Sequence, residues 1–570
     1  MDYIILENKM PNDLNIINSK TKKGLFFLPL GGVGEIGANC YLYCCDGSWI
    51  MIDLGVSFAD EKFPGIDLLV PKLNILENIN NNLEGIIISH GHEDHAGALP
   101  YFIDKINCPV YATEFACNLI KRKLKEFSLS EKVKLKKINT KKNLSFKNFN
   151  LSFIETTHSI PEPHAIKIKT NYGNILHTAD WKIDNSPLIG NNFNSTYFED
   201  IGNEGLLALV GDSTNANTSG YSGSENEVRN YLIKLFSRYN KCIVITCFSS
   251  NITRLESISF AAKKNNRKVG IIGRSLKRMI EVAYESGYLK NTDQFIFQED
   301  LKNYSKDNLV IICTGSQGEK KSALYRIAYN SHQHLKLNSG DVVIFSSKDI
   351  PGNEKSINNL KNLLTRQKIE IITSNEEELV HVSGHAYNEE IKEMYQWTRP
   401  FLSVPIHGEP VHLFEHAKIA QSCQVPQTKI LDNGSLLKIA PNDPEIIDKI
   451  ENGKMIVEGG KIYNSESEFI KERLKYSYDG IVMITLLINK DHSINKNITI
   501  SQIGLPIDNI KRLYDNFRLK FSEEYTKLID KELDKENNET IKTLSKKIIK
   551  KYCLQEYKRK PEVQTHIVRI

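Results

Sequence analysis

The chain has 570 residues, which is too long for one hydrophobic core and predicts about three domains. Its 40% hydrophobic and 25% charged residues are ordinary for a globular protein, and no apolar run is long enough to cross a bilayer. The formal charge of +5 permits an anionic partner without requiring one. The ten cysteines are scattered without a CxxC pair, so we expect neither disulfides nor thiolate zinc sites, and a cytoplasmic location.

The predicted elements change character along the chain. From 25 to 60, glycine turns separate several short strands, and residues 85–89 predict a buried strand that leads into a helix near 94–104. Between about 207 and 375, apolar strands alternate with amphipathic helices, which is typical of a parallel α/β unit. Histidine-rich segments return at 381–416. Further short strands are expected at 108–113, 151–156, 165–170 and 174–178.

The most informative stretch is IIISHGHEDHAG at 86–97, where three histidines and two acids follow a buried strand. A strand end is a rigid place from which to project side chains, and imidazole and carboxylate are the ligands that zinc takes where thiolate is absent. His90 and His92 are two residues apart and face the same way in extended backbone. Asp94 and His95 fall where a helix begins and can bend toward a second ion. A polar loop of solvated histidines is a poor explanation of this pattern.

Three more ligand candidates each follow an apolar run. His158 lies in FIETTHSIPEP, Asp180 in ILHTADWKID and His407 in FLSVPIHGEP. Any one of them could be a capping or core residue, but together with the preceding loop they predict a centre for two metal ions. By contrast, His412 and His416 share one helix face and lack the glutamate of a zincin motif, so we expect no ligand role for them.

Further motifs occur in a characteristic order. They are GGVGEIGAN, GHEDHAGALP, THSIP, HTADWKID, GDSTNAN, GRS, TGSQGE, IPGNE, HVSGHA and PIHGE. The ligand set resembles that of the metallo-β-lactamase fold, and the whole series is similar to that of the ribonuclease J family. The resemblance covers roughly residues 25–440 at motif density and is looser beyond them. Ala179 stands where glycine is commoner, and the residues after Pro161 vary among relatives, but neither departure touches a ligand position.

The resemblance implies an α/β protein with three parts. These are a metallo-β-lactamase αββα sandwich, an inserted β-CASP parallel α/β domain and a small C-terminal α+β domain. We place the first part of the lactamase domain at 1–206, the β-CASP domain at 207–375 and the second lactamase part at 376–445. A polar linker at 446–464 would lead to the C-terminal domain at 465–570.

The resemblance also implies a cofactor of two zinc ions, for which Mn²⁺ or Mg²⁺ can substitute. The ligands would be His90, His92 and His158 for one ion, Asp94, His95 and His407 for the other, and Asp180 as the bridge between them. Such a pair lowers the pKa of a water molecule toward neutrality and neutralises the charge that builds on phosphoryl oxygens.

The leaving ribose oxygen needs a proton, and the resemblance places His385 and Asp212 together beside the metals. Asp212 would orient His385 and raise its pKa, so that His385 acts as the general acid; the alternative that it only binds the scissile phosphate stays open. We expect Asp94, one of the candidate metal ligands, to take part in catalysis as well. Substrate contacts are expected from Ser249, Ser250, Asn251, His381, Val382, Ser383, Gly384 and His385. Ser249–Asn251 could instead cap a helix.

The implied activity is hydrolysis of RNA from the 5′ end, with internal cleavage as well, in rRNA processing and mRNA decay. The expected substrate is single-stranded RNA with a 5′-monophosphate, and the expected assembly is a homodimer or homotetramer without membrane attachment. A DNA-directed β-CASP nuclease would tend to carry valine in place of His407. A non-catalytic RNA-binding or partner-binding subunit would have lost ligands that this chain keeps. The basic segment SKKIIKK near the C-terminus could bind RNA, but a solvated helix face explains it better.

Overall fold

The computed structural model describes residues 14–129, 132–350, 352–374, 378–490, 493–495, 497–530 and 538–570. The chain divides into two compact units, residues 1–57 with 70–454 and residues 58–69 with 455–570. The predicted domain boundary at 375–376 lies outside the described residues. Of the helices in the described ranges, none has the length and apolar character needed to cross a membrane.

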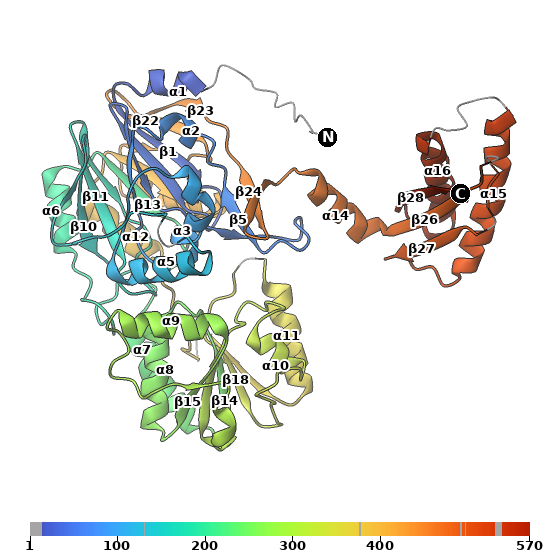
Figure 1. The fold of residues 1–570 in the computed structure, drawn as a ribbon. Coiled ribbons are helices and arrows are strands. Elements are labelled where there is room, and N and C mark those ends of the chain that lie inside the picture. The colour runs from blue at the N-terminus through green and yellow to red at the C-terminus, as the bar shows by residue number, and fades with distance from the viewer. Residues whose placement is uncertain are drawn as a thin grey trace. The chain divides into compact units, whose positions relative to one another are not determined.

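The first unit contains two sheets packed face to face, as expected for the αββα sandwich (Figure 1). The first sheet has the order β23-β22-β1-β2-β3-β6-β7-β8 and the second has the order β21-β20-β13-β12-β11-β10-β9. The strands of the first are β1 Leu25–Gly31, β2 Cys40–Cys45, β3 Ser48–Ile52, β6 Leu83–Ile87, β7 Val110–Ala112, β8 Leu135–Lys137, β22 Ser435–Ala440 and β23 Glu445–Lys449. Those of the second are β9 Leu144–Ser145, β10 Asn150–Glu155, β11 His164–Thr170, β12 Gly173–His177, β13 Ala208–Asp212, β20 Leu402–Ile406 and β21 Gln427–Thr428.

The core between these sheets is built from both of them, for example from Phe27 and Ile87 of the first and Ile168 and Val404 of the second. β1, β2 and β3 are buried at every position, as in strands covered on both faces. The helices of this part are α1 Leu14–Lys20, α2 Leu76–Ile79, α3 Glu93–Ala96, α4 Leu99–Phe102, α5 Glu114–Glu126, α6 Thr196–Glu204, α12 Asn388–Thr398 and α13 Pro410–Ser422. α6, α12 and α13 pack on the second sheet, and α5 contacts β7 and β8.

β13 lies inside the range predicted for the β-CASP domain but belongs to the second sheet of the sandwich. It pairs in parallel with β12 on one side and with β20 on the other. Parallel strands buried on both faces read alike in either domain, because each is a short continuous apolar run. By strand pairing, the inserted unit therefore begins after Asp212.

The inserted unit is a parallel sheet with the order β16-β15-β17-β14-β18-β19 and helices on both faces. Its strands are β14 Ile243–Thr246, β15 Lys268–Ile272, β16 Ile296–Phe297, β17 Leu309–Cys313, β18 Val342–Phe345 and β19 Glu370–Thr373. Its helices are α7 Glu225–Ser237, α8 Ile252–Lys264, α9 Arg274–Glu285, α10 Ala323–Ala328 and α11 Glu354–Arg366. α7, α8 and α9 cover one face, and α10 and α11 cover the other. This is the parallel α/β unit that the alternating pattern predicted.

The second unit contains a three-stranded sheet, β27-β26-β28, on which two long helices pack. Its elements are α14 Glu468–Asp479, β26 Ile481–Ile488, β27 Thr499–Ile503, α15 Ile510–Asp530, α16 Asn538–Tyr557 and β28 Glu562–Arg569. Four short strands lie at or near the unit boundaries along the sequence. They are β4 Ser57–Phe58, β5 Leu68–Pro71, β24 Lys454–Glu458 and β25 Lys461–Asn464. The stretch expected to be a linker, 446–464, thus includes the antiparallel hairpin β24–β25. All ten cysteines are free thiols, as expected.

Candidate functional site

The HGHEDH loop begins where β6 ends. Ser89 and His90 are buried, and the Ser89 Oγ lies 3.0 Å from His90 Nδ1. His92 stays extended, with φ −67° and ψ 152°, immediately before α3. As a result the His92 Nδ1 lies 3.0 Å from the His90 Nε2. The extended backbone thus turns alternate side chains of the loop toward one point.

Three strand ends of the second sheet bring further candidates to the same place. His158 follows β10, Asp180 follows β12 and His407 follows β20. The His158 Nε2 lies 3.0 Å from His92 Nδ1, and the His407 Nδ1 lies 2.8 Å from Asp180 Oδ1. His407 has a left-handed φ of 50°, and its N–H donates a 2.5 Å hydrogen bond to the Gly32 carbonyl. This backbone conformation, uncommon outside glycine, aims the ring into the cluster.

The donor atoms of the predicted ligands form overlapping groups in which all atoms lie within 4.8 Å of one another. One group is His90, His92, His158 and Asp180, a second is Asp94, His95, Asp180 and His407, and a third is Asp180, Asp212, His385 and His407. Asp180 is common to all of them. The structure therefore brings all seven predicted ligands together, with Asp180 between the first two groups.

The three histidines of the first group, His90, His92 and His158, are uncharged rings with nitrogen lone pairs. Burial, joined by the neighbouring ring of His95, lowers the pKa of His90 well below its ordinary value, and burial likewise lowers the pKa of His158. Burial also lowers the pKa of His92 to about 4. At neutral pH these rings are uncharged and carry lone pairs, which is the form that binds a divalent cation.

The second group, which contains Asp94, His95, Asp180 and His407, favours the binding of positive charge. Burial opposes protonation of His95 and His407, but the carboxylates around them, Asp180 first, outweigh it and raise both pKa values, that of His407 to about 10. Burial would raise the pKa of Asp180, yet the facing histidines hold it well below its usual range. A divalent cation supplies the same positive charge that these carboxylates otherwise draw from protons. The donor set therefore fits a metal ion held by imidazole and carboxylate.

His385 and Asp212 adjoin this cluster. The His385 Nδ1 lies 2.8 Å from Asp212 Oδ2, and the other Asp212 oxygen accepts hydrogen bonds from the N–H and hydroxyl of Thr214 at 2.9 and 2.7 Å. Burial lowers the pKa of His385, but Asp212 and then Asp180 outweigh this and raise it. The His385 side chain is 22% exposed, whereas Asp212 is 2% exposed. A substrate can therefore reach the imidazole while the carboxylate holds it from behind.

Gly384 joins the 381–385 loop to the cluster of candidate metal ligands. Its carbonyl accepts a 2.5 Å hydrogen bond from His158 Nδ1, which leaves His158 Nε2 facing the cluster. A Cβ at this position would lie 2.8 Å from two atoms of the His158 ring, so only glycine fits. In the same loop Val382 and Ser383 are buried and His381 is half-buried, with burial lowering the pKa of His381 to about 3.

The loop at 249–251 follows β14 in the inserted unit. Ser249 and Ser250 are half-buried there. Asn251 caps α8: its side-chain oxygen accepts a 2.9 Å hydrogen bond from Arg254 N, and its amide donates to Glu225 at 3.4 Å. Asn251 therefore caps the helix, which is the alternative role considered for this loop. Ser249 and Ser250 are the loop residues whose side chains are available to a substrate.

Four family models match the chain. They are the metallo-β-lactamase superfamily over residues 33–192, the ribonuclease J β-CASP domain over 240–364, the Zn-dependent metallo-hydrolase RNA specificity domain over 354–422 and the ribonuclease J C-terminal domain over 468–570. Ribonuclease J of Sinorhizobium meliloti is 39% identical over 486 residues, which are 85% of this chain and 86% of that protein. The chain belongs to the ribonuclease J family. It is accordingly a nuclease of the hydrolase class that acts on RNA.

Other ribonuclease J proteins are similar over comparable lengths. That of Helicobacter pylori is 34% identical over 86% of this chain and 72% of its own length, and ribonuclease J2 of Bacillus subtilis is 31% identical over 83% and 86%. A solved structure of a protein of unknown function from Enterococcus faecalis shares the fold, with a TM-score of 0.52 and 15% identity over 72% of this chain and 99% of that one. Membership in this RNA-directed family does not favour a DNA-directed or non-catalytic role.

One buried carboxylate of this ribonuclease J-family site escaped the sequence analysis. Asp53, at the end of β3, lies 2.7 Å from His95 Nδ1 and accepts hydrogen bonds from the Ser89 hydroxyl and N–H, both at 2.8 Å. Because Ser89 contacts His90, Asp53 supports one candidate ligand directly and a second through Ser89. Its position directly after the apolar run WIMI is the signal that could have found it.

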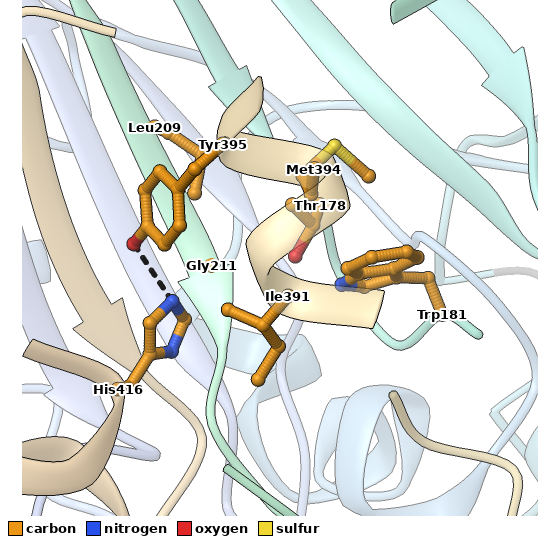
Figure 2. A pocket seen from close by; sticks show the side chains of 8 residues that line it. All are labelled: Thr178, Trp181, Leu209, Gly211, Ile391, Met394, Tyr395 and His416. Carbon is orange, nitrogen blue, oxygen red and sulfur yellow. Dashed lines mark hydrogen bonds between the residues drawn. The ribbon is translucent and has the colours of Figure 1, made fainter. Parts of the chain in front are cut away.

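Behind Asp212 the ribonuclease J-family domain is closely packed. Figure 2 shows His416, Tyr395 and the other side chains that line a small pocket. This pocket has no room for a water molecule. The His416 Nε2 lies 2.8 Å from the Tyr395 hydroxyl, and its Nδ1 lies 2.8 Å from the Ser213 hydroxyl, next to Asp212. Burial lowers the pKa of His416 to about 4. Among the described residues, the groups of side chains that could hold a metal ion do not include His412 or His416.

Proposed function

We propose that the chain is a two-metal RNA phosphodiesterase that uses zinc, with Mn²⁺ or Mg²⁺ as substitutes. The observation that carries the proposal is the convergence of seven side chains from separate segments on a shared Asp180. The ligands would be His90, His92 and His158 at one ion, Asp94, His95 and His407 at the other, and Asp180 at both. When bound, the ions would supply an activated water nucleophile and neutralise charge on the scissile phosphate.

His385 would donate a proton to the leaving ribose 3′-oxygen. The hydrogen bond to Asp212 supports this role, because it fixes the ring and favours its protonated form. The exposed part of His385 would also allow contact with the phosphate itself, which is the alternative role. In both roles, general acid or phosphate contact, the imidazole lies against the scissile group, and the kinetics of a His385→Ala variant separate the two roles.

The RNA would lie against the 381–385 loop and against Ser249 and Ser250. Gly384 allows close approach of a phosphate to the backbone of the loop, and the serine hydroxyls follow the carboxyl end of a parallel strand, where such sheets bind ligands. We propose single-stranded RNA with a 5′-monophosphate as the substrate, 5′–3′ exonuclease action together with internal cleavage, and a homodimer or homotetramer as the assembly.

The test is cleavage of single-stranded RNA with end-resolved product mapping. We expect turnover with added zinc or manganese, none with EDTA, and none of a DNA of the same sequence. His92→Ala and Asp180→Ala should lower the rate at least about a thousandfold while circular dichroism stays unchanged. RNAs with triphosphate, monophosphate and hydroxyl 5′ ends reveal the mode, because release of mononucleotides from the monophosphate alone indicates exonuclease action. Unchanged rates in both variants would refute the proposal.

A further inference from the structure

Lys348 follows β18 and contacts Asn215, which is bonded to Ser383 of the 381–385 loop; no carboxylate of the described residues pairs with it. Its Nζ donates a 2.9 Å hydrogen bond to Asn215 Oδ1. Among the described residues this is its single side-chain acceptor, and it forms no ion pair within 4.0 Å. Burial lowers the pKa of the amine. The residue as a whole is exposed, and its Nζ also lies 6.0 Å from the centre of the Tyr387 ring. An ammonium group that no carboxylate of the described residues neutralises is suited to bind an anion.

The Lys348 loop is held in place from the inserted unit. Gln317, which is 6% exposed, donates a 3.0 Å hydrogen bond from Nε2 to the Lys348 carbonyl. The Gln317 Oε1 accepts a 2.8 Å hydrogen bond from the N–H of Ile350. The backbone of Lys348 is therefore fixed by Gln317 while its amine is fixed by Asn215. A side chain anchored at both ends loses little freedom when it binds a ligand.

The amine is connected to the candidate site by a short chain of hydrogen bonds. The Asn215 amide donates to Ser383 Oγ at 2.8 Å, and that hydroxyl accepts a 3.1 Å hydrogen bond from the His385 N–H. Burial is the main cause of the lowered pKa of His381, followed by the charges of Arg254 and Lys182, and the charge of Lys348 adds to them. The ammonium group is thus linked through Asn215 to the loop expected to meet the RNA.

We propose that Lys348 binds a phosphate of the RNA strand that lies against residues 381–385, with Asn215 as the residue that positions its ammonium. RNA carries a negative charge at every linkage, and a cation beside the loop can stabilise that charge. The inference rests on the RNA substrate and on the position of the loop, not on which metal ions bind. The phosphate is either the 5′-terminal monoester or an internal diester.

The experiment measures binding of a fluorescently labelled single-stranded 12-nucleotide RNA to the full chain in EDTA, from about 50 to 300 mM salt. Lys348→Met removes the charge, Lys348→Gln removes the charge but keeps a donor for Asn215, and Lys348→Arg keeps the charge. The matched control is Lys336→Met, an exposed lysine that precedes β18 and so lies at the opposite end of that strand.

We expect Lys348→Met and Lys348→Gln to weaken binding about tenfold at 0.1 M salt and to reduce the slope of log K against log[salt] by about 0.7. Lys348→Arg and Lys336→Met should keep the wild-type slope. RNAs with 5′-monophosphate and 5′-hydroxyl ends distinguish the two sources. A loss confined to the monophosphate identifies the terminal group, and an equal loss identifies an internal linkage.

Two results would overturn the inference. One is an unchanged salt slope in both neutral variants, even if their turnover falls, because Lys348 would then only support Asn215. The other is an equal loss in Lys336→Met, which would make the effect one of overall charge. Since binding is measured in EDTA, neither result bears on the two-metal proposal, which fails instead if ligand variants keep full activity.

Discussion

Arg254 and Val380 are joined by a buried hydrogen bond in which the guanidinium donates to the Val380 carbonyl at 3.0 Å. Arg254 is fully buried, and its other donors go to Ser346 and to the carboxylate of Glu225 at 2.7 and 3.0 Å. Val380 directly precedes the 381–385 loop. One side chain of α8 therefore ties the inserted sheet to the loop that carries the candidate acid.

We predict that Arg254→Met destabilises the protein by about 3–5 kcal/mol, because it leaves the buried Glu225 carboxylate without its charge partner. Denaturant unfolding followed by circular dichroism measures the loss. The double variant Arg254→Met with Glu225→Gln should recover part of it, since no unpaired charge then remains. A single variant as stable as the wild type would mean that the pair contributes nothing.

Asp53→Asn should weaken metal binding about 10- to 100-fold, because Asp53 orients His95 and, through Ser89, His90. Chelator competition measures the affinity directly, and excess metal should restore most of the RNA cleavage. Asp104→Asn is the matched control, since Asp104 is an exposed carboxylate of the same domain. Equal affinities in the two variants would contradict the orienting role.

His385→Ala separates the two roles considered for this residue. As the general acid it should lower kcat about 10²- to 10⁴-fold with little change in KM. As a phosphate contact alone it should mainly raise KM. Steady-state kinetics on a 5′-monophosphorylated RNA give both constants. Asp212→Asn should show the same pattern with a smaller loss, because it acts through the His385 ring.

We predict that Glu562 makes the second unit sensitive to acid. Burial would raise its pKa, but hydrogen bonds from Lys475 and Lys546, with Lys550 nearby, lower it to about 2. Because the folded value lies below the ordinary 4.5, this carboxylate contributes stability above pH 4.5 that is lost as the pH falls toward 2.

Hydrogen exchange of β26, whose residue Ile481 pairs with Glu562, tests this prediction. Protection of the wild-type strand should fall below pH 4.5 by more than the intrinsic pH dependence of exchange explains. In Glu562→Gln, which cannot titrate, protection should be lower at neutral pH and should change less on acidification. Parallel curves for the two proteins would show that Glu562 has no such effect.

The ligand set was accessible to sequence reasoning because its members share a local signature, a polar residue directly after an apolar strand. His158, Asp180 and His407 each follow a strand of the second sheet, and strand ends at one edge of a sheet meet in space. Asp53 carries the same signature after β3, yet its partner His95 lies 42 positions away and no local pattern connects them.

The candidate metal ligands and the alternation of strands and helices in the inserted unit could be predicted from the sequence, because both depend on spacing within short segments. Four other features appear in the folded chain alone: β13 joins the sandwich, Gly384 fixes His158, Arg254 bonds to Val380 beside the 381–385 loop, and Lys348 is linked to that loop through Asn215. Those outcomes depend on packing between segments far apart in the chain. A buried parallel strand or a single lysine does not encode its distant neighbour.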